Sequence, residues 1–164
     1  MQSKFWPGVW EIVKFGLIVL AIVMPIRLYI AQPFIVAGES MAPTFGSGDY
    51  LIIDELTYNF LQEPQKGEVV VFRYPQDPSK FFIKRIVGLP GEELVVDGVE
   101  WKMGENEYFV MGDNSRFSLD SRSWGALPRE NITGRALLRL WPPTAFAYMP
   151  GSEGIGSNFR AVGE

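Results

Sequence analysis

The sequence predicts a mostly β protein, with a compact sheet or barrel-like domain behind one N-terminal transmembrane helix. The 164 residues include 17 glycines and 12 prolines, and 14% are aromatic, a composition typical of a turn-rich β domain. A long apolar run lies near the N-terminus, and at least seven short strand-like runs follow it. We therefore expect a head and anchor at residues 1–32, a β-rich domain at 33–150 and a flexible tail at 151–164.

The expected anchor is the apolar segment 9–31, whose centre at 15–26 carries no charged residue. Counted from Glu11 onward, it reaches the roughly 20 residues that a bilayer requires. Lys14 and Arg27 lie near its two ends, where their charges can reach polar surroundings. The alternatives are a cleaved signal peptide and a buried core helix. Because no pair of small residues follows at the spacing of a cleavage site, the sequence favours an uncleaved anchor.

The charges on either side of this segment predict its orientation. Lys4 and Lys14 lie on the N-terminal side, whereas every charged residue between Arg27 and Lys66 is acidic. Positive charge is retained in the cytoplasm. We expect a single-pass protein of the plasma membrane, with a cytoplasmic N-terminus and the β domain on the extracytoplasmic side.

The β domain is predicted from runs of β-branched and aromatic residues separated by glycine and proline. The expected strands are Phe34–Val36, Asp49–Asp54, Glu68–Arg73, Lys80–Val87, Glu93–Val96, Val99–Trp101, Tyr108–Met111 and Ala136–Trp141. Asp97-Gly98 suits a tight hairpin turn. The expected loops are 38–48, 74–79 and 112–124, and the segment 56–65 is ambiguous.

The absence of two residue types excludes several kinds of site. Without cysteine, the chain has no thiol nucleophile, disulfide or thiolate metal site. Without histidine, it has neither a Ser-His-Asp arrangement nor the usual zinc ligands. The net charge of −4 and the pI of about 5.0 provide no basic face for nucleic acid. We expect no cofactor, no metal and no nucleic-acid partner, and a hydrolytic base must be a lysine, a carboxylate or the N-terminal amine.

Two segments carry the candidate chemistry. Ser40 lies in Gly-Glu-Ser-Met-Ala-Pro-Thr, directly after the apolar segment, and Lys84 lies in the apolar run Phe-Phe-Ile-Lys-Arg-Ile-Val. A serine hydroxyl needs a base to become a nucleophile. Lysine becomes such a base when burial lowers its pKa from about 10.4, by as much as about 3–5 units. We interpret Ser40 as the nucleophile and Lys84 as its base.

Each of these residues also has an ordinary interpretation. Ser40 would be a loop serine, and Lys84 would be an edge-strand lysine that discourages aggregation. Strand alternation places Lys84 on one face with Phe82 and Ile86, and Arg85 on the opposite face. Only one of these two cations can therefore share a site with Ser40.

The chain resembles the bacterial type I signal peptidases, also called leader peptidases, over about residues 12–145. The resemblance depends on boxes that follow an apolar segment in a fixed order. They are Gly-Glu-Ser-Met-Ala-Pro-Thr, then Gly-Asp-Tyr-Leu, then Lys-Arg-Ile-Val-Gly-Leu-Pro-Gly-Glu, then Met-Gly-Asp-Asn-Ser-Arg-Phe-Ser-Leu-Asp-Ser-Arg-Ser-Trp-Gly. A closing Gly-Arg-Ala to Trp-Pro segment is similar to the last strand of that family.

The resemblance implies a serine endopeptidase on a mostly β fold, anchored so that its active site faces the outer membrane leaflet. Such enzymes remove signal peptides from exported preproteins through an acyl-enzyme, after small residues in Ala-X-Ala-like sites. The partners would be preprotein signal peptides and the lipid bilayer. Ser40 matches the nucleophile, Lys84 the general base and Ser118 the serine that orients the lysine amine. Asp120 and Arg122 match an ion pair near the site.

The resemblance also implies shallow apolar pockets that select small side chains. The matching residues are Val36, Met41, Phe45, Phe82 and Ile83. Their ordinary interpretation is hydrophobic core. Two departures from the family pattern stand out. Gly38 replaces a serine that binds the oxyanion in some members, and the segment before Ser118 has Arg116 displaced by one place and an unusual Phe117.

Two other functions fit parts of the pattern. A related Ser/Lys protease could be a dedicated maturation peptidase or a self-cleaving repressor, although an apolar segment occupies the place of the repressor's DNA-binding head. A catalytically silent β module would instead bind extended segments at the membrane. A serine-directed acylating agent distinguishes this module, because its Ser40 would not be labelled.

Overall fold

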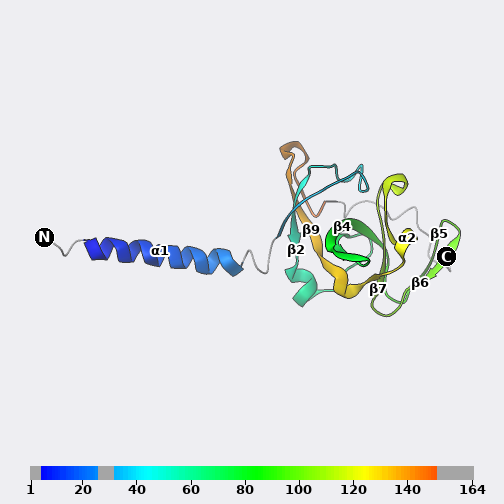
Figure 1. Cartoon of the computed structure of the whole chain (residues 1–164), viewed down its shortest axis with the longest axis horizontal. Helices are drawn as coiled ribbons and strands as arrows, with labels where there is room; N and C mark the ends of the chain where they lie inside the picture. Colours follow the sequence, from blue (N-terminus) through cyan, green and yellow to red (C-terminus); the bar gives the residue numbers. More distant parts are fainter. Residues whose placement is uncertain (1–4, 26–31, 151–164) are drawn as a thin grey trace.

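A long helix followed by a β domain makes up the computed structural model, which describes residues 5–25 and 32–150 (Figure 1). Within the helix, side chains are described for residues 8–24. The expected tail at 151–164, the first four residues and residues 26–31 of the expected anchor lie outside the described residues.

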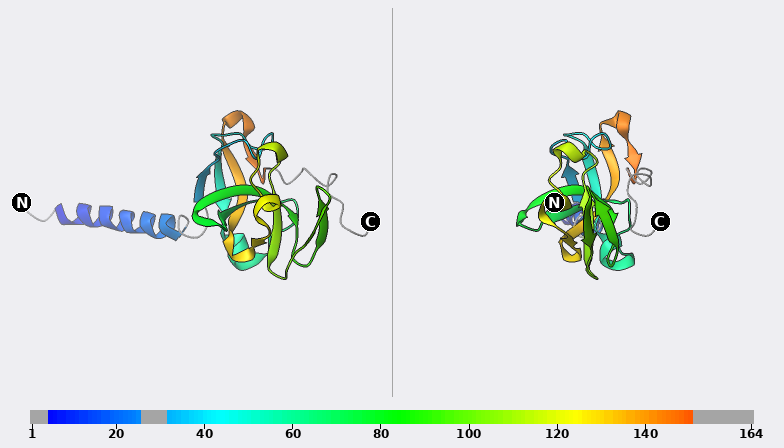
Figure 2. Two further views of the ribbon diagram at one scale, coloured as in Figure 1. Left: turned by 45° about the vertical axis from the view of Figure 1, so that its right-hand side comes forward. Right: turned by 90° about the vertical axis from the view of Figure 1, so that its right-hand side faces the viewer.

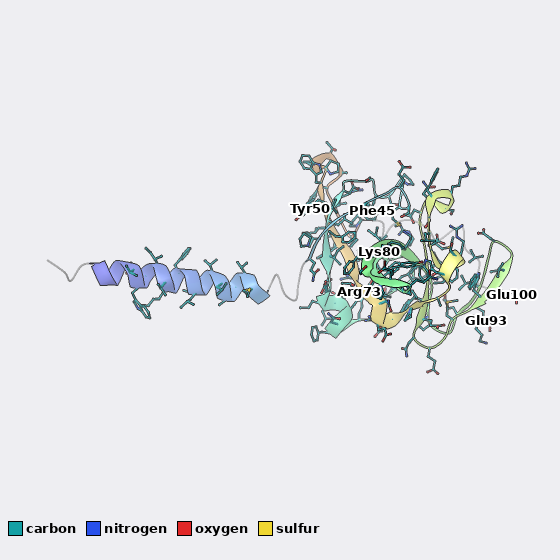
Figure 3. All side chains as sticks on the ribbon, in the orientation of Figure 1. Phe45, Tyr50, Arg73, Lys80, Glu93 and Glu100 are labelled. Carbon is teal, nitrogen blue, oxygen red and sulfur yellow. The ribbon has the colours of Figure 1, made fainter. Side chains whose placement is uncertain are left out.

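The helix α1 spans Phe5–Pro25 and contains most of the apolar N-terminal segment. Its described side chains, among them Ile12, Phe15 and Ile18, are exposed and project around the helix (Figure 3). Within the described part of the chain, no helix has the combined length and apolar character needed for a membrane span. The helix is thus confirmed as an element, and its transmembrane role stays a prediction.

The β domain contains ten strands within the described residues, more than the eight runs named from the sequence. They are β1 (Gln32–Ile35), β2 (Tyr50–Asp54), β3 (Val69–Tyr74), β4 (Asp77–Gly88), β5 (Glu93–Val96), β6 (Val99–Lys102), β7 (Glu107–Met111), β8 (Leu127–Pro128), β9 (Ile132–Trp141) and β10 (Ala147–Tyr148). The main sheet has the order β1-β2-β9-β3-β4-β7-β8, with β10 on β9, and β5-β6 form a separate hairpin. The views in Figure 2 show the main sheet curled on itself, as the barrel-like prediction required.

Two of the unpaired strand edges in the described residues border the candidate site. β1 pairs with β2 alone among the described strands. β4 pairs with β3 along most of its length, but β7 joins it only from Arg85 onward. The stretch of β4 that contains Phe81 and Ile83 therefore has an unpaired edge in the described structure.

Three hydrophobic clusters form the core. The first contains Met41 and Phe45 from the loop after β1, packed with Ile83 of β4 and with side chains of β2 and β3. The second lies on the other face of β4, around Phe72 and Ile86. The third lies under the β5-β6 hairpin. Because both faces of β4 are covered from Ile83 onward, the side chains of this stretch are held in fixed directions.

Two strands extend furthest beyond the predicted bounds. β4 begins at Asp77 instead of Lys80, and Pro78 is tolerated there because only one neighbouring strand needs its backbone groups. β9 begins at Ile132, before Gly134, where a Cβ would approach the Asp54 carbonyl oxygen to 2.5 Å. The close crossing of β9 over the end of β2 therefore requires glycine.

Short helical turns account for further differences. The ambiguous segment after β2 contains the π-helical turn η2 (Thr57–Leu61). The expected polar loop after β7 contains the 3-10 turn η3 (Ser115–Phe117) and the short helix α2 (Ser121–Trp124). Two further 3-10 turns, η4 (Arg129–Asn131) and η5 (Pro143–Ala145), flank β9.

Candidate active site

Ser40 lies in a turn between β1 and β2 that is fixed from two sides. Met41 and Phe45 are fully buried beneath it, and the Phe45 amide donates to the Met41 carbonyl at 2.9 Å. On the other side, the Asn114 amide donates to the Ser40 carbonyl oxygen at 2.9 Å. The turn is thus tied both to the core and to the loop after β7, which leaves the Ser40 side chain directed at β4.

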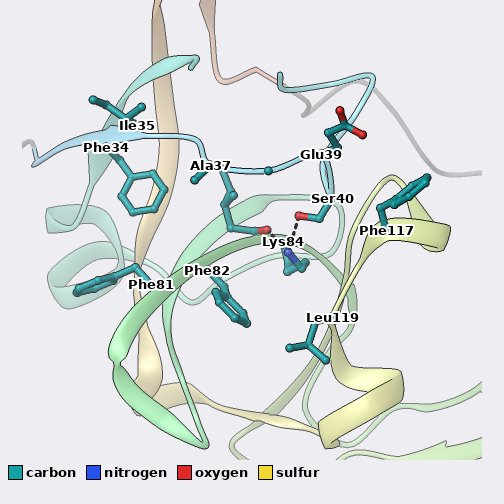
Figure 4. Close-up of a pocket in the computed structure, with 12 residues that line it drawn as sticks. Phe34, Ile35, Ala37, Glu39, Ser40, Phe81, Phe82, Lys84, Phe117 and Leu119 are labelled. Atoms are coloured by element: carbon teal, nitrogen blue, oxygen red, sulfur yellow. Dashed lines mark hydrogen bonds between the residues drawn. The ribbon is translucent and has the colours of Figure 1, made fainter. Parts of the chain in front are cut away.

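Lys84 reaches this serine from the middle of β4. A hydrogen bond of 2.8 Å joins its Nζ to Ser40 Oγ, and Nζ also donates to the Ile83 carbonyl at 2.8 Å (Figure 4). The residue is only 4% exposed, and its Nζ lies 5.5 Å from the centre of the Phe82 ring. The structure therefore brings together the two residues that the sequence singled out, although they are far apart along the chain.

The surroundings of Lys84 favour its neutral form. Burial lowers the pKa of the Lys84 amine to about 8, while the more distant charges of Asp120 and Asp113 act in the opposite direction. Among the ion pairs in the described residues, none includes Lys84. A buried amine without a carboxylate partner gives up its proton at a lower pH than an exposed lysine does, which is what a general base requires.

A cavity of about 240 Å³ opens beside this pair (Figure 4). Its walls come from the two free edges, the chain from Phe34 to Ser40 on one side and from Phe81 to Lys84 on the other. Phe117 and Leu119, from the loop after β7, line the end beyond Ser40. A serine, an amine and an apolar cavity between two unpaired strand edges suit acyl transfer on an extended peptide.

Comparison with known proteins agrees with this geometry. The model of the family "Signal peptidase, peptidase S26" matches residues 9–100 and 96–141, most of the chain. The chain belongs to the signal peptidase family. A probable signal peptidase I-1 of Synechocystis sp. is 31% identical, over 91% of this chain and 93% of its own. A signal peptidase I of Leptolyngbya laminosa is 35% identical over 75% of both chains, and a probable signal peptidase I-2 of Synechocystis sp. is 37% identical over 71% of this chain and 66% of its own.

The ion pair expected in this signal peptidase family member is present. Asp120 is fully buried and accepts bonds of 2.9 Å from both Nε and Nη2 of Arg122, and one of 3.1 Å from the Gly112 amide. Burial acts to raise the pKa of Asp120, but these hydrogen bonds hold it below its usual value. Arg122 also donates to the Ser115 carbonyl at 2.9 Å. The pair therefore fixes the loop after β7 against the site.

Ser118 lies beside this pair. Its hydroxyl is buried close to Asp120, whose pKa it helps to lower, but it forms no hydrogen bond with Lys84 Nζ. Its side chain packs against Gly112, and a Cβ on that glycine would also approach the Ser40 carbonyl oxygen to 2.5 Å. The structure thus places Ser118 beside Gly112 and close to the Ser40 backbone, and its orienting role stays a prediction.

The residues expected to form the substrate pockets separate into two groups. Phe82 and Ile83 line the cavity. Val36, Met41 and Phe45 belong to the buried cluster beneath it instead, in agreement with their ordinary interpretation as core. Side chains that the sequence did not identify take their places: Phe34, Ile35, Ala37, Phe81, Phe117 and Leu119. Because Val36 points into the core, alternation along the strand could have indicated that Ile35 and Ala37 point out of it.

A buried network supports the serine turn from behind, and its pairing was not predicted from the sequence. Arg85 is 2% exposed and donates from Nε and Nη2 to the two oxygens of Asp113, at 2.8 and 2.6 Å. Asp113 also accepts a bond of 2.5 Å from the Thr44 hydroxyl, at the end of the serine turn. Arg85 and Lys84 thus point in opposite directions, as alternation predicted, and the arginine holds the turn.

The described residues offer no ready metal site. No group of three or more histidine, cysteine, aspartate or glutamate side chains within them is arranged to hold a metal ion.

Proposed function

We propose that this signal peptidase family member is a serine endopeptidase that removes signal peptides from exported preproteins through a Ser40/Lys84 dyad. The observation that carries the proposal is the hydrogen bond of 2.8 Å between Ser40 Oγ and a buried Lys84 Nζ without an ion-pair partner. Membership of the family supports the substrate class.

The dyad performs the reaction in two steps. Neutral Lys84 takes the Ser40 proton while Oγ attacks the scissile carbonyl, and the lysine then passes this proton to the leaving amine. The signal peptide remains attached to Ser40 as an ester. Water attacks this ester while Lys84 takes a proton from the water and returns it to the departing Ser40 Oγ. The signal peptide leaves as a carboxylic acid that ionises to a carboxylate in the solvent, and the neutral lysine and the serine hydroxyl are restored.

The oxyanion is stabilised by the backbone N–H of Ser40, with a second donor from the backbone or from water. Gly38 has no side-chain donor, and its φ of 90° is a conformation that residues with a Cβ rarely adopt. A single oxyanion donor contributes about 10²–10³ in rate in serine proteases. The local backbone thus supports an oxyanion site built without a side chain at this position.

Substrate enters as an extended strand between the two free edges, β1 and the stretch of β4 before Arg85. Main-chain hydrogen bonds to such edges supply affinity, and pockets for alternate side chains supply specificity. Phe82 and Ile83 restrict the space next to Ser40. Small residues at the first and third positions before the cut, the pattern of signal peptides, fit there.

We also propose that the N-terminal segment anchors the enzyme in the plasma membrane, with the N-terminus in the cytoplasm and the β domain outside. The uncharged stretch at 15–26 and the exposed apolar side chains of α1 support this. The anchor would hold the active site close to the membrane in which the signal peptide lies.

Cleavage of a preprotein in detergent tests the dyad directly. The comparison includes the unchanged enzyme, Ser40→Ala, Lys84→Ala and the control Lys66→Ala, whose lysine forms a partly exposed pair with Glu92 at 2.9 Å. We expect cleavage after a small residue by the unchanged enzyme and the control alone. Cleavage by the Lys84 variant would exclude the lysine as the base.

A further inference from the structure

A second cavity lies next to the catalytic one and shares two of its walls. It has a volume of about 230 Å³ and is lined by Phe34 of β1 and Phe81 of β4, which also line the catalytic cavity. Ile53 of β2, Val71 of β3 and Thr133 of β9 complete its interior. It therefore continues the channel between the two free edges, away from Ser40.

One acidic side chain, Glu55, lines this otherwise largely apolar space. Its Oε1 is buried and has no hydrogen-bond partner. Burial raises the pKa of the Glu55 carboxyl, with the charge of Arg73 acting against this shift. Within the described residues no ion pair joins Glu55 and Arg73, and the arginine instead lies 5.3 Å from the centre of the Phe81 ring.

A buried carboxyl oxygen without a hydrogen-bond partner destabilises the enzyme when no substrate is bound. A buried polar atom without a partner loses the hydrogen bonds that water would provide. A hydrogen-bond donor that enters the cavity restores them, and a cation is the strongest donor for a carboxylate. The apolar walls formed by Phe34 and Phe81 suit the methylene stem of a lysine side chain.

The position of the cavity identifies the part of the substrate that reaches it. Phe81 precedes Lys84 by three residues in β4, and an extended strand rises about 3.3 Å per residue, so the cavity begins about 10 Å from the dyad. Gln32 and Pro33, the first described residues after the anchor segment, lie at its rim. Because the apolar part of a signal peptide shares the membrane with that anchor, the cavity lies on the upstream side of the cut.

We propose that this second cavity is an upstream subsite in which Glu55 selects a lysine side chain four to six residues before the cleaved bond. The inference rests on the proposed function, since it assigns a specificity determinant to the same peptidase. The enzyme would then recognise a lysine in addition to the small residues at the first and third positions before the cut. This lysine would lie between those small residues and the apolar part of the signal peptide.

A peptide series measures this selection. Each peptide has the same small residues before the cut and carries either lysine or the uncharged isostere norleucine, at one of the fourth, fifth and sixth upstream positions. We expect lysine to raise kcat/KM about tenfold at one of these positions, since a hydrogen bond to a charged group is worth about that factor. In Glu55→Gln the ratio of lysine to norleucine should fall close to one.

Two controls separate this result from a general effect. Glu105→Gln changes an exposed acid elsewhere on the domain and should keep the full ratio. Glu55→Lys should reverse the preference, so that glutamate is cleaved better than lysine at the same position. Urea unfolding of each variant establishes that it is folded before ratios are compared.

Three outcomes would overturn the inference. Equal cleavage of lysine and norleucine peptides by the unchanged enzyme would exclude an acidic upstream subsite while leaving the peptidase intact. A ratio that survives in Glu55→Gln would show that another group recognises the lysine. Absence of cleavage of every peptide, including the reference with small residues alone, would remove the proposed function and the subsite together.

Discussion

At the scale of single residues, the proposed role of Lys84 as the base depends on where its side chain is buried. An exposed lysine is protonated at neutral pH and is a poor base. A lysine paired with a carboxylate is held in its protonated form and cannot accept a proton. β4 solves both problems, because alternation sends Lys84 toward Ser40 and sends Arg85 to Asp113 on the opposite face. Asp113 is thus paired with Arg85, and Asp120 with Arg122, so that neither carboxylate forms an ion pair with Lys84.

The pH dependence of cleavage follows from this environment. With the pKa of Lys84 lowered to about 8, the amine is protonated below that pH and cannot accept the Ser40 proton. We expect kcat/KM for a soluble peptide to rise about tenfold per pH unit below about pH 7, and to level off above about pH 9. A profile that is flat from about pH 6 to pH 8 would mean that another group is the base.

Gly112 is a second residue on which the site depends. A Cβ there would collide with the Ser118 side chain and lie 2.5 Å from the Ser40 carbonyl oxygen, so Gly112→Ala must displace the serine. A shift of about 1 Å can lower a rate about 100-fold, and we expect a loss of that order in kcat/KM.

Gly46→Ala is the matched control for this substitution. Its Cβ would find its nearest neighbour, Asp49 Oδ1, at an ordinary 3.8 Å, so activity should stay near that of the unchanged enzyme. Comparable activity in both variants would show that the serine turn tolerates the displacement.

At the scale of elements, the serine turn is held to β4 and the loop after β7 by the Arg85–Asp113–Thr44 network. In Asp113→Ala the arginine keeps its charge but loses its carboxylate while 2% exposed. Removing one partner of a buried ion pair costs about 3–5 kcal/mol, and we expect the free energy of unfolding to fall by about that amount in urea. Cleavage should also weaken, because Thr44 loses its anchor.

The exposed pair between Glu93 and Lys102 provides the comparison, because it joins two neighbouring strands of the same domain at 2.6 Å. Solvent screens such a pair, so Glu93→Ala should leave the urea midpoint nearly unchanged. Equal destabilisation by the two substitutions would contradict a special role for the buried network.

The elements also show how far the sequence predicts this structure. Eight of the ten strands and the positions of Ser40 and Lys84 could be predicted, because alternation, turns and short motifs are local patterns. The Thr44–Asp113 bond joins residues 69 positions apart, and no local pattern pairs them. Val36, Met41 and Phe45 illustrate the same limit, since local sequence marks them as apolar but only the packing shows that they lie under the cavity.

At the scale of the whole molecule, the β domain has a core of its own. The three buried clusters draw all their members from residues 34–136, whereas the described side chains of α1 are exposed. Removal of residues 1–31 should therefore leave the β domain folded. The proposed role of the N-terminal segment, to concentrate the site at the membrane, would be lost.

Because the β domain has its own core, removal of residues 1–31 should affect the cleavage of two kinds of substrate differently. The shortened enzyme should cleave a short soluble peptide with nearly unchanged kcat/KM, because the dyad and the cavity lie wholly within the β domain. Cleavage of a preprotein embedded in lipid vesicles should fall about 100-fold, since tethering to a shared surface raises effective concentration by such factors. An equal loss on both substrates would instead mean that the N-terminal segment shapes the active site, and equal retention would exclude a role as an anchor.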